Sequence, residues 1–232
     1  MADEHDHDHD HDGENPEEIY HPHVHEEGKF LKWDDDSDHD VNETGHYELM
    51  AEAIRELLIE KEIVTADDIR ANIEFMDSRG PHLGARIVAK AWTDPEYKKR
   101  LMEDGSAAVG ELGIPMGDVE LVVVENTDDA HNMIVCKLCS CYPRTILGLP
   151  PDWYKSKSYR ARVVHEPRVV LKEFGTDLAE TTTVRVHDSN ADMRYLVLPK
   201  RPDGTDGWTE EQLSALVTRD SMVGTALAKS PG

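Results

Sequence analysis

Cysteine is scarce in this chain, with three residues in 232. All three lie within six residues, at positions 136, 139 and 141. This number and spacing exclude a disulfide framework. Long apolar runs are also missing, because no stretch approaches the roughly 20 residues needed to span a bilayer. The N-terminus lacks the basic-then-apolar pattern of a signal peptide. We therefore expect a cytoplasmic protein that does not enter a membrane.

Basic residues are few as well: 25 Lys and Arg stand against 48 Asp and Glu, a formal net charge of −23. No cluster of Lys or Arg is present that would neutralise phosphates, which excludes a nucleic-acid partner. The acidity is uneven. The first 46 residues hold 17 acids, two lysines and nine of the 13 histidines, a charge of −15. The other 186 residues carry −8, an ordinary value for a globular protein.

The stretch 1–46 is predicted to be a disordered tail. It alternates His and Asp over residues 5–12, and its low apolar content buries too little area to offset chain entropy. Imidazoles beside carboxylates bind divalent transition metals, so one hypothesis is a weak metal-collecting tail. An inert solvated tail and an expression tag are the alternatives.

Helical and strand periodicities divide the rest of the chain in two. Apolar residues at helical spacing predict four helices in the first part. The first runs from 47 to about 61, the second begins after the cap-like Thr65, the third spans about 82–92 and the fourth runs from 95 to 102. Strand-like runs follow at 120–125, 133–135, 184–187 and 195–198, and a capping box at Thr209 precedes a last helix over 213–217. The prediction is an α+β protein with a helical N-terminal arm (47–110). An α/β sandwich-like, metal-binding catalytic domain (111–232) carries the cysteines.

The cysteine loop, residues 136–141, offers three soft thiolates close enough to meet one metal ion. Zinc needs four ligands, and the fourth would be His131 or a partner group, because no second cysteine pair exists. The Cys139-Ser140-Cys141 segment also lets backbone nitrogens reach the same ion, which favours low-spin trivalent cobalt or iron with an open sixth position. Redox or cluster chemistry is a third alternative. The spacing alone leaves all three open.

Longer motifs surround this loop. The two that include or directly follow it are VCKLCSCYP at 135–143 and LGLPPDWYK at 147–155. Others are AWTDPEYK (91–98), VENT (124–127), HN (131–132), YRARVV (159–164), EPR (166–168), DS (188–189), GTDGW (204–208) and VTRD (217–220). Together these motifs resemble the nitrile hydratase α subunit family. The resemblance covers about residues 47 to 225, with the His/Asp tail outside it.

The resemblance implies a metal held by the thiolates of Cys136, Cys139 and Cys141 and the amide nitrogens of Ser140 and Cys141. It also implies oxidation of Cys139 to a sulfinate and of Cys141 to a sulfenate. Arginines from a β-type subunit would pair with these oxygens, so the site would lie at a subunit interface. The metal would polarise a nitrile, and the Cys141 sulfenate oxygen or a water would attack its carbon, giving an amide.

One metal per chain is expected, and cobalt is preferred to iron. Lys137 stands where the family has Thr in cobalt enzymes or Ser in iron enzymes, so this indicator is lost, whereas Tyr142 favours cobalt. A metallochaperone or activator protein is a further candidate partner. We expect one of Arg160, Arg162 and Arg168 to brace the anionic loop.

Arg144 departs from the nitrile hydratase pattern, which usually has Trp there, and is similar to the related thiocyanate hydrolase γ subunits. A guanidinium suits an anion, whereas an aromatic wall suits an uncharged nitrile. Met116 stands where many nitrile hydratases have Gln. Cys139, Ser140, Cys141 and Arg144 are the predicted catalytic residues, with a small nitrile or thiocyanate as substrate. A non-catalytic zinc-binding or metal-storage protein is the remaining alternative.

Overall fold

The computed structural model describes residues 45–231 of the chain. The predicted tail lies outside this range except for its last two residues, and its proposed role stays a prediction. Within the described range the chain forms helices and strands in a mixed order, which confirms the expected mixture of the two. The elements are α1 (His46–Glu60), α2 (Ala66–Asp77), α3 (Pro81–Thr93), α4 (Pro95–Glu103), α5 (Gly105–Gly110), β1 (Glu120–Glu125), β2 (Ala130–Val135), α6 (Arg144–Leu147), α7 (Asp152–Lys155), α8 (Lys157–His165), α9 (Pro167–Glu173), β3 (Thr183–Asp188), β4 (Met193–Leu198), α10 (Glu210–Ser214) and α11 (Arg219–Val223).

Local capping explains where several helices begin. Thr65 accepts a hydrogen bond from the Asp68 amide at 3.0 Å, and the Asp68 carboxylate accepts one from the Thr65 amide at 2.9 Å. Pro81 lies in the first turn of α3, where a missing N–H is tolerated, so it opens that helix as well as following α2.

The prediction of a single last helix over 213–217 was wrong. The helix α10 begins directly after its cap Thr209 and ends at Ser214, three residues earlier than predicted. A further helix, α11, follows it. Thr218 accepts a hydrogen bond from the Ser221 amide at 3.1 Å and caps this second helix, a signal that the sequence argument did not use.

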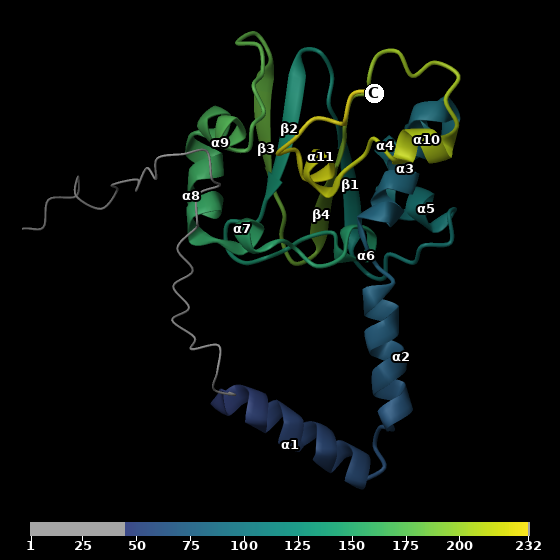
Figure 1. Cartoon of the computed structure of the whole chain (residues 1–232), viewed down its shortest axis with the longest axis vertical. Helices are drawn as coiled ribbons and strands as arrows, with labels where there is room; N and C mark the ends of the chain where they lie inside the picture. Colours follow the sequence, from purple (N-terminus) through teal and green to yellow (C-terminus); the bar gives the residue numbers. More distant parts are fainter. Residues whose placement is uncertain (1–44, 232) are drawn as a thin grey trace, which may run out of the picture. The chain divides into compact units, whose positions relative to one another are not determined.

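The four strands form two parallel pairs, β1 with β4 and β2 with β3. Parallel neighbours require long crossovers, and here the chain from β2 to β3 contains α6 to α9. Figure 1 shows the strands in the middle, with α8 and α9 beside β3 and with α4 and α5 on the side of β1. The sandwich-like layering and the domain boundaries at 46 and 110 stay predictions.

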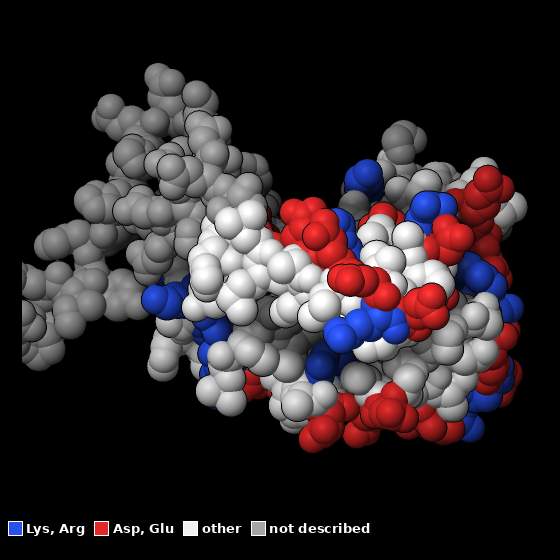
Figure 2. All heavy atoms as spheres, turned by 90° about the horizontal axis from the view of Figure 1, so that it is seen from below, with Lys and Arg blue, Asp and Glu red and all other residues white. Residues whose placement is uncertain are grey.

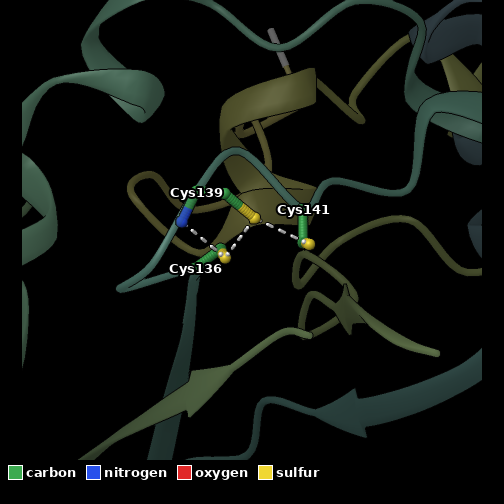
Figure 3. A group of neighbouring side chains, drawn as sticks. All are labelled: Cys136, Cys139 and Cys141. Carbon is green, nitrogen blue, oxygen red and sulfur yellow. Dashed lines mark hydrogen bonds between the residues drawn. The ribbon is translucent and has the colours of Figure 1, made fainter. Parts of the chain in front are cut away.

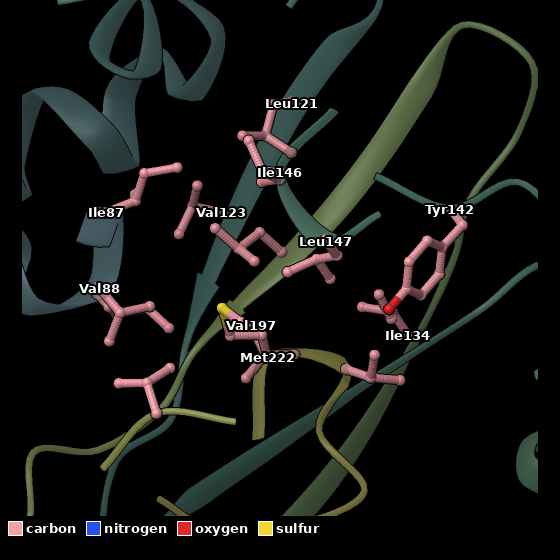
Figure 4. Close-up of a cluster of buried hydrophobic side chains, with 14 of the residues drawn as sticks. Ile87, Val88, Leu121, Val123, Ile134, Tyr142, Ile146, Leu147, Val197 and Met222 are labelled. Atoms are coloured by element: carbon pink, nitrogen blue, oxygen red, sulfur yellow. The ribbon is translucent and has the colours of Figure 1, made fainter. Parts of the chain in front are cut away.

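One hydrophobic core joins α3 to the strands and to the segment that follows the cysteines. Figure 4 shows Ile87 of α3, Leu121 of β1 and Ile134 of β2 in this cluster, with side chains of α6, β4 and α11. Every residue of β2 is buried. The strand that leads into the cysteine loop is therefore anchored along its whole length, which fixes where the loop begins.

The outer surface has a different character from the core. The helices α1 and α2 bury no residue. Figure 2 shows Lys and Arg in small separate groups on the face that it displays, with Asp and Glu along much of the rim. In the part of the chain that is described, no helix is long and apolar enough to cross a membrane.

Candidate metal centre

The cysteine loop begins directly after the buried strand β2 and brings three sulfur atoms together. The Cys139 Sγ lies 3.3 Å from that of Cys136 and 3.1 Å from that of Cys141. All three sulfurs lie within 4.8 Å of one another (Figure 3). Cys136 is buried, Cys139 is exposed and Cys141 is intermediate, and none forms a disulfide. The loop therefore presents a convergent set of free thiols with an inner and an outer side.

Hydrogen bonds from distant elements hold the backbone of this loop. The Asp188 carboxylate, at the end of β3, accepts a bond from the Lys137 amide at 3.0 Å and pairs with the Lys137 ammonium at 3.2 Å. The Tyr154 hydroxyl donates to the Cys141 carbonyl at 2.9 Å. The Arg160 guanidinium donates to the Lys137 carbonyl at 3.5 Å, the outer limit of a hydrogen bond. The loop is thus positioned at both of its ends.

The thiols respond electrostatically to one another and to their surroundings. Hydrogen bonding from the Cys141 and Cys136 thiols lowers the pKa of Cys139. Burial, with hydrogen bonding to the other two cysteines, raises the pKa of Cys141 to about 12. The charge of Arg194 acts in the opposite direction on Cys141. Three thiolates this close repel one another, so a cation between them is needed before all can be ionised.

The donor set fits a transition metal. Thiolates are soft ligands that select such ions over Mg²⁺ or Ca²⁺, and the converging sulfurs come from residues two and three positions apart. Among residues 45–231 no other group of three His, Cys, Asp or Glu side chains converges in this way. His131, considered above as a fourth zinc ligand, is buried elsewhere: its Nε2 lies 2.7 Å from the Gly224 carbonyl and its Nδ1 lies 3.2 Å from the Asn126 amide nitrogen.

A hollow of about 350 Å³ opens beside the loop. The site hollow, as we call it, is lined by residues 139–141 of the loop, by residues 142–145, and by Met116, Val119 and Arg194. Cys139, Ser140, Cys141 and Arg144, predicted from sequence as one site, do line one cavity. Cys136, directly after β2, is buried and does not line this cavity.

Arg144 lies at the start of α6 and is exposed. Its guanidinium has no hydrogen-bond or ion-pair partner within the described range. Of the three arginines expected to brace the loop, only Arg160 reaches it, whereas Arg162 pairs with Glu166 and with Glu173 at 2.6 Å. Arg168 instead donates to backbone carbonyls of residues 179, 180 and 182.

Sequence reasoning missed Arg194. It lies 53 positions after Cys141 in the chain, at the second residue of β4, and no local motif marks it. The parallel pairing of β4 with β1, in which Arg194 stands opposite Leu121, brings it to the site hollow. This strand register cannot be deduced from the residues next to the cysteines.

Comparison with known proteins identifies the group to which the chain is related. The family model described as nitrile hydratase, alpha chain, matches residues 45–226. The cobalt-containing nitrile hydratase subunit alpha of Pseudonocardia thermophila is 52% identical over 181 residues, which cover 77% of this chain and 89% of that protein. The thiocyanate hydrolase subunit gamma of Thiobacillus thioparus is 47% identical over 204 residues, which cover 83% and 84%.

A solved structure gives the same result. A double mutant of the Fe-type nitrile hydratase from Comamonas testosteroni Ni1 superposes with a TM-score of 0.74 at 44% identity, covering 80% of this chain and 91% of that one. The relatives thus include proteins named for cobalt, for iron and for thiocyanate. The family model matches most of the chain, and about half of the aligned residues are identical in these relatives. This chain therefore belongs to the nitrile hydratase alpha chain family.

Proposed function

We propose that this chain is the metal-carrying subunit of a nitrile hydratase that converts a nitrile to its amide. The observation that carries the proposal is the convergence of the Cys136, Cys139 and Cys141 sulfurs within 4.8 Å at one side of the site hollow. Membership of the nitrile hydratase family supports the same reaction class.

The three thiolates, with the backbone nitrogens of Ser140 and Cys141, would hold one trivalent metal. Cobalt is preferred, because several relatives are named as cobalt-containing, although an iron-type structure is also similar. When bound, the metal supplies Lewis acidity toward a nitrile. Cys139 is proposed to carry a sulfinate and Cys141 a sulfenate, whose oxygens need cationic partners.

The residues of the chain prepare the site hollow for a small substrate. Met116 and Val119 give it an apolar wall, which suits an uncharged carbon chain. Tyr142, directly after the last cysteine, is almost completely buried and packs against Tyr154 with ring centroids 4.9 Å apart. This aromatic packing makes the floor beneath Cys141 rigid, so that a reacting oxygen on its sulfur would be held in a fixed direction.

A second candidate function is hydrolysis of thiocyanate to carbonyl sulfide and ammonia. It is favoured by the unpaired guanidinium of Arg144, which lines the site hollow, because an unpaired cation beside a cavity attracts an anion. The similarity to a thiocyanate hydrolase subunit gamma supports it further. Arg144 is the residue on which the two candidates differ most.

The partner is proposed to be a β-type subunit that covers the site and contributes arginines. The helices α1 and α2 support the need for such a partner, because they bury no residue within this chain and expose several large apolar side chains. A helix face of this kind is normally covered in the assembled protein.

The test uses the complex purified with its partner subunit. Elemental analysis, mass spectrometry of the peptide that contains the cysteine loop, and turnover of a nitrile and of thiocyanate are measured on one preparation. Cobalt at one per chain, oxygen on Cys139 and Cys141, and amide formation would support the proposal. Zinc with unmodified cysteines and no turnover would instead support the metal-storage alternative and refute the enzyme.

A further inference from the structure

Arg194 is a cation that the rest of the described chain does not neutralise. Its Nη1 donates to the Asn190 carbonyl and, at 3.2 Å, to the Met193 carbonyl. Both acceptors are neutral backbone groups, and no carboxylate in residues 45–231 forms an ion pair with it. The two carbonyls therefore hold one end of the guanidinium in position, and its positive charge remains available to bind an anion.

The surroundings of Arg194 indicate which anion it binds. The side chain comes from β4 and lines the site hollow together with Cys139, Ser140 and Cys141. Arg194 is only partly exposed, in contrast to the exposed Arg144. A positive charge that is partly removed from water is costly unless an anion faces it. The cysteine loop contributes Cys139, Ser140 and Cys141 to this lining, and no carboxylate of the described residues is among the lining residues.

We infer that Arg194 is this chain's own counter-cation for the oxidised cysteine loop, and that its guanidinium binds the oxyanion carried by Cys141. The inference rests on the proposed function, which requires that oxygen. Arg194 is a positioning residue: it holds the sulfenate oxygen in one direction and stabilises its negative charge. Arg194 would then neutralise part of the negative charge of the oxidised cysteines, and the arginines expected from the partner subunit would neutralise the rest.

The position of Arg194 on a strand suits this role. Its backbone is fixed by parallel pairing with β1, and its Nη1 is fixed by the two carbonyls, so few rotamers remain to be restricted when it binds an anion. Arginine can also present further N–H groups in a planar fork, which matches an oxygen on sulfur better than a lysine ammonium does.

The experiment compares Arg194→Gln and Arg194→Lys in the full-length chain purified with its partner. Arg168→Gln is the matched control, because Arg168 also donates to backbone carbonyls but does not line the site hollow. Mass spectrometry measures the fraction of chains with oxygen on Cys141. Elemental analysis measures the metal that remains after incubation with a chelator.

Loss of a charge-assisted bond corresponds to about a tenfold fall in the ratio of modified to unmodified Cys141 in Arg194→Gln. Arg194→Lys should recover most of that loss, and Arg168→Gln should match the unsubstituted protein. An unchanged ratio in Arg194→Gln would overturn the inference. An equal loss in Arg194→Lys or in Arg168→Gln would also overturn it, because backbone bracing and not charge would then be responsible.

The same measurements separate this inference from the proposed function. If the unsubstituted complex carries no oxygen on Cys139 or Cys141, the proposed function fails and the Arg194 inference fails with it. If the unsubstituted complex is modified and Arg194→Gln is modified to the same extent, only the Arg194 inference fails.

Discussion

The hydroxyl of Tyr154 donates a 2.9 Å hydrogen bond to the carbonyl oxygen of Cys141. Tyr154 is fully buried in α7, so the last cysteine of the loop is attached to the hydrophobic core through its backbone, while its sulfur remains at the site hollow. Burial raises the pKa of Tyr154, which keeps the hydroxyl protonated and able to donate.

The replacement Tyr154→Phe should therefore loosen the backbone of the cysteine loop and weaken its binding of the proposed metal. It removes one hydrogen bond to a partly buried carbonyl, which costs about 1 kcal/mol and lowers the Tm of the complex by roughly 2–4 °C. The control is Tyr159→Phe, which loses a 2.8 Å bond to the Ile134 carbonyl in β2 instead. Metal loss to a chelator should accelerate in Tyr154→Phe only. Equal rates in the two variants would show that the bond to Cys141 has no special role.

Cys139→Ser should abolish stable metal binding without unfolding the chain, because Cys139 is exposed and its thiol contributes little to the core. Changes to residues beyond the ligands typically cost 10–100-fold in metal affinity, so loss of a ligand should cost at least about a hundredfold. Ser140→Ala is the control, since it keeps the backbone nitrogen proposed as a ligand. Elemental analysis of both purified complexes decides the outcome; full metal content in Cys139→Ser would remove this residue from the ligand set.

Arg144→Trp should shift selectivity from anionic toward neutral substrates. A charge-assisted bond to an anion contributes about 1.5–3 kcal/mol, so kcat/KM for thiocyanate relative to a neutral nitrile should fall about tenfold or more. The side chain is exposed, and the variant should keep its fold and metal. Both substrates are assayed with one preparation, and a constant ratio would exclude Arg144 from substrate selection.

Stability should fall as the solution becomes mildly acidic, through His131. Burial lowers the pKa of His131, and its ring accepts from Asn126 at Nδ1 while Nε2 donates to the Gly224 carbonyl. Its contribution is complete above the unfolded pKa of about 6.5 and is lost as the pH falls through that value toward the lowered folded pKa. The unfolded chain binds a proton there that the folded chain excludes.

The matched variant is His131→Gln, which keeps a donor and an acceptor but does not titrate. Unfolding of the complex is followed from pH 8 to pH 5, and the difference in slope between the two proteins should approach about 1.4 kcal/mol per pH unit at most. His187, whose pKa burial also lowers, is present in both proteins and cancels in the comparison. Identical slopes would show that His131 does not govern the acid sensitivity.

Association with the partner subunit should depend on the apolar face of α1. Tyr47, Met50, Ile54 and Leu57 are spaced by three and four residues and are 45–83% exposed. Ile54→Glu should weaken the complex about tenfold or more, because burial of one such side chain contributes about 1.5–3 kcal/mol. Sedimentation of the complex over a dilution series measures this. Glu56→Gln, on another face of the helix, should have no effect, and equal behaviour of the two variants would place the interface elsewhere.

The parts of the fold that local sequence determines were predicted from the sequence. The cap at Thr65, the β-branched run of β1 and the cysteine spacing are all visible within a few residues, and each was found. The short helices α6 to α9 were missed, since four to nine residues give little periodicity to detect. The parallel strand pairing was missed as well, because it joins segments that are 50 to 75 residues apart.

The residues of the candidate site also fall into a group that local sequence predicts and a group that only the fold brings together. Cys136 to Cys141 lie in one continuous stretch, so their common location followed from the spacing. Arg144 was assigned to the site from the family resemblance. Arg194 and Tyr154 reach the same place only through β4 and α7, whose positions depend on core packing and not on any pattern near the cysteines. Arginine is a common residue, so Arg194 could not be recognised as a site residue before the structure showed that it lies beside the loop.

The link from Lys137 to Asp188 sets the order of events during synthesis. The proposed ligands are complete once residue 141 has been made. The Asp188 carboxylate that holds the loop backbone, and the strand β3 that ends with it, follow 47 residues later. At about 5–20 residues per second the nascent chain waits roughly 2–10 s with three thiols and no fixed geometry. The proposed metal would therefore be captured in its final geometry only after β3 has paired, and non-local pairing of this kind is slow to form.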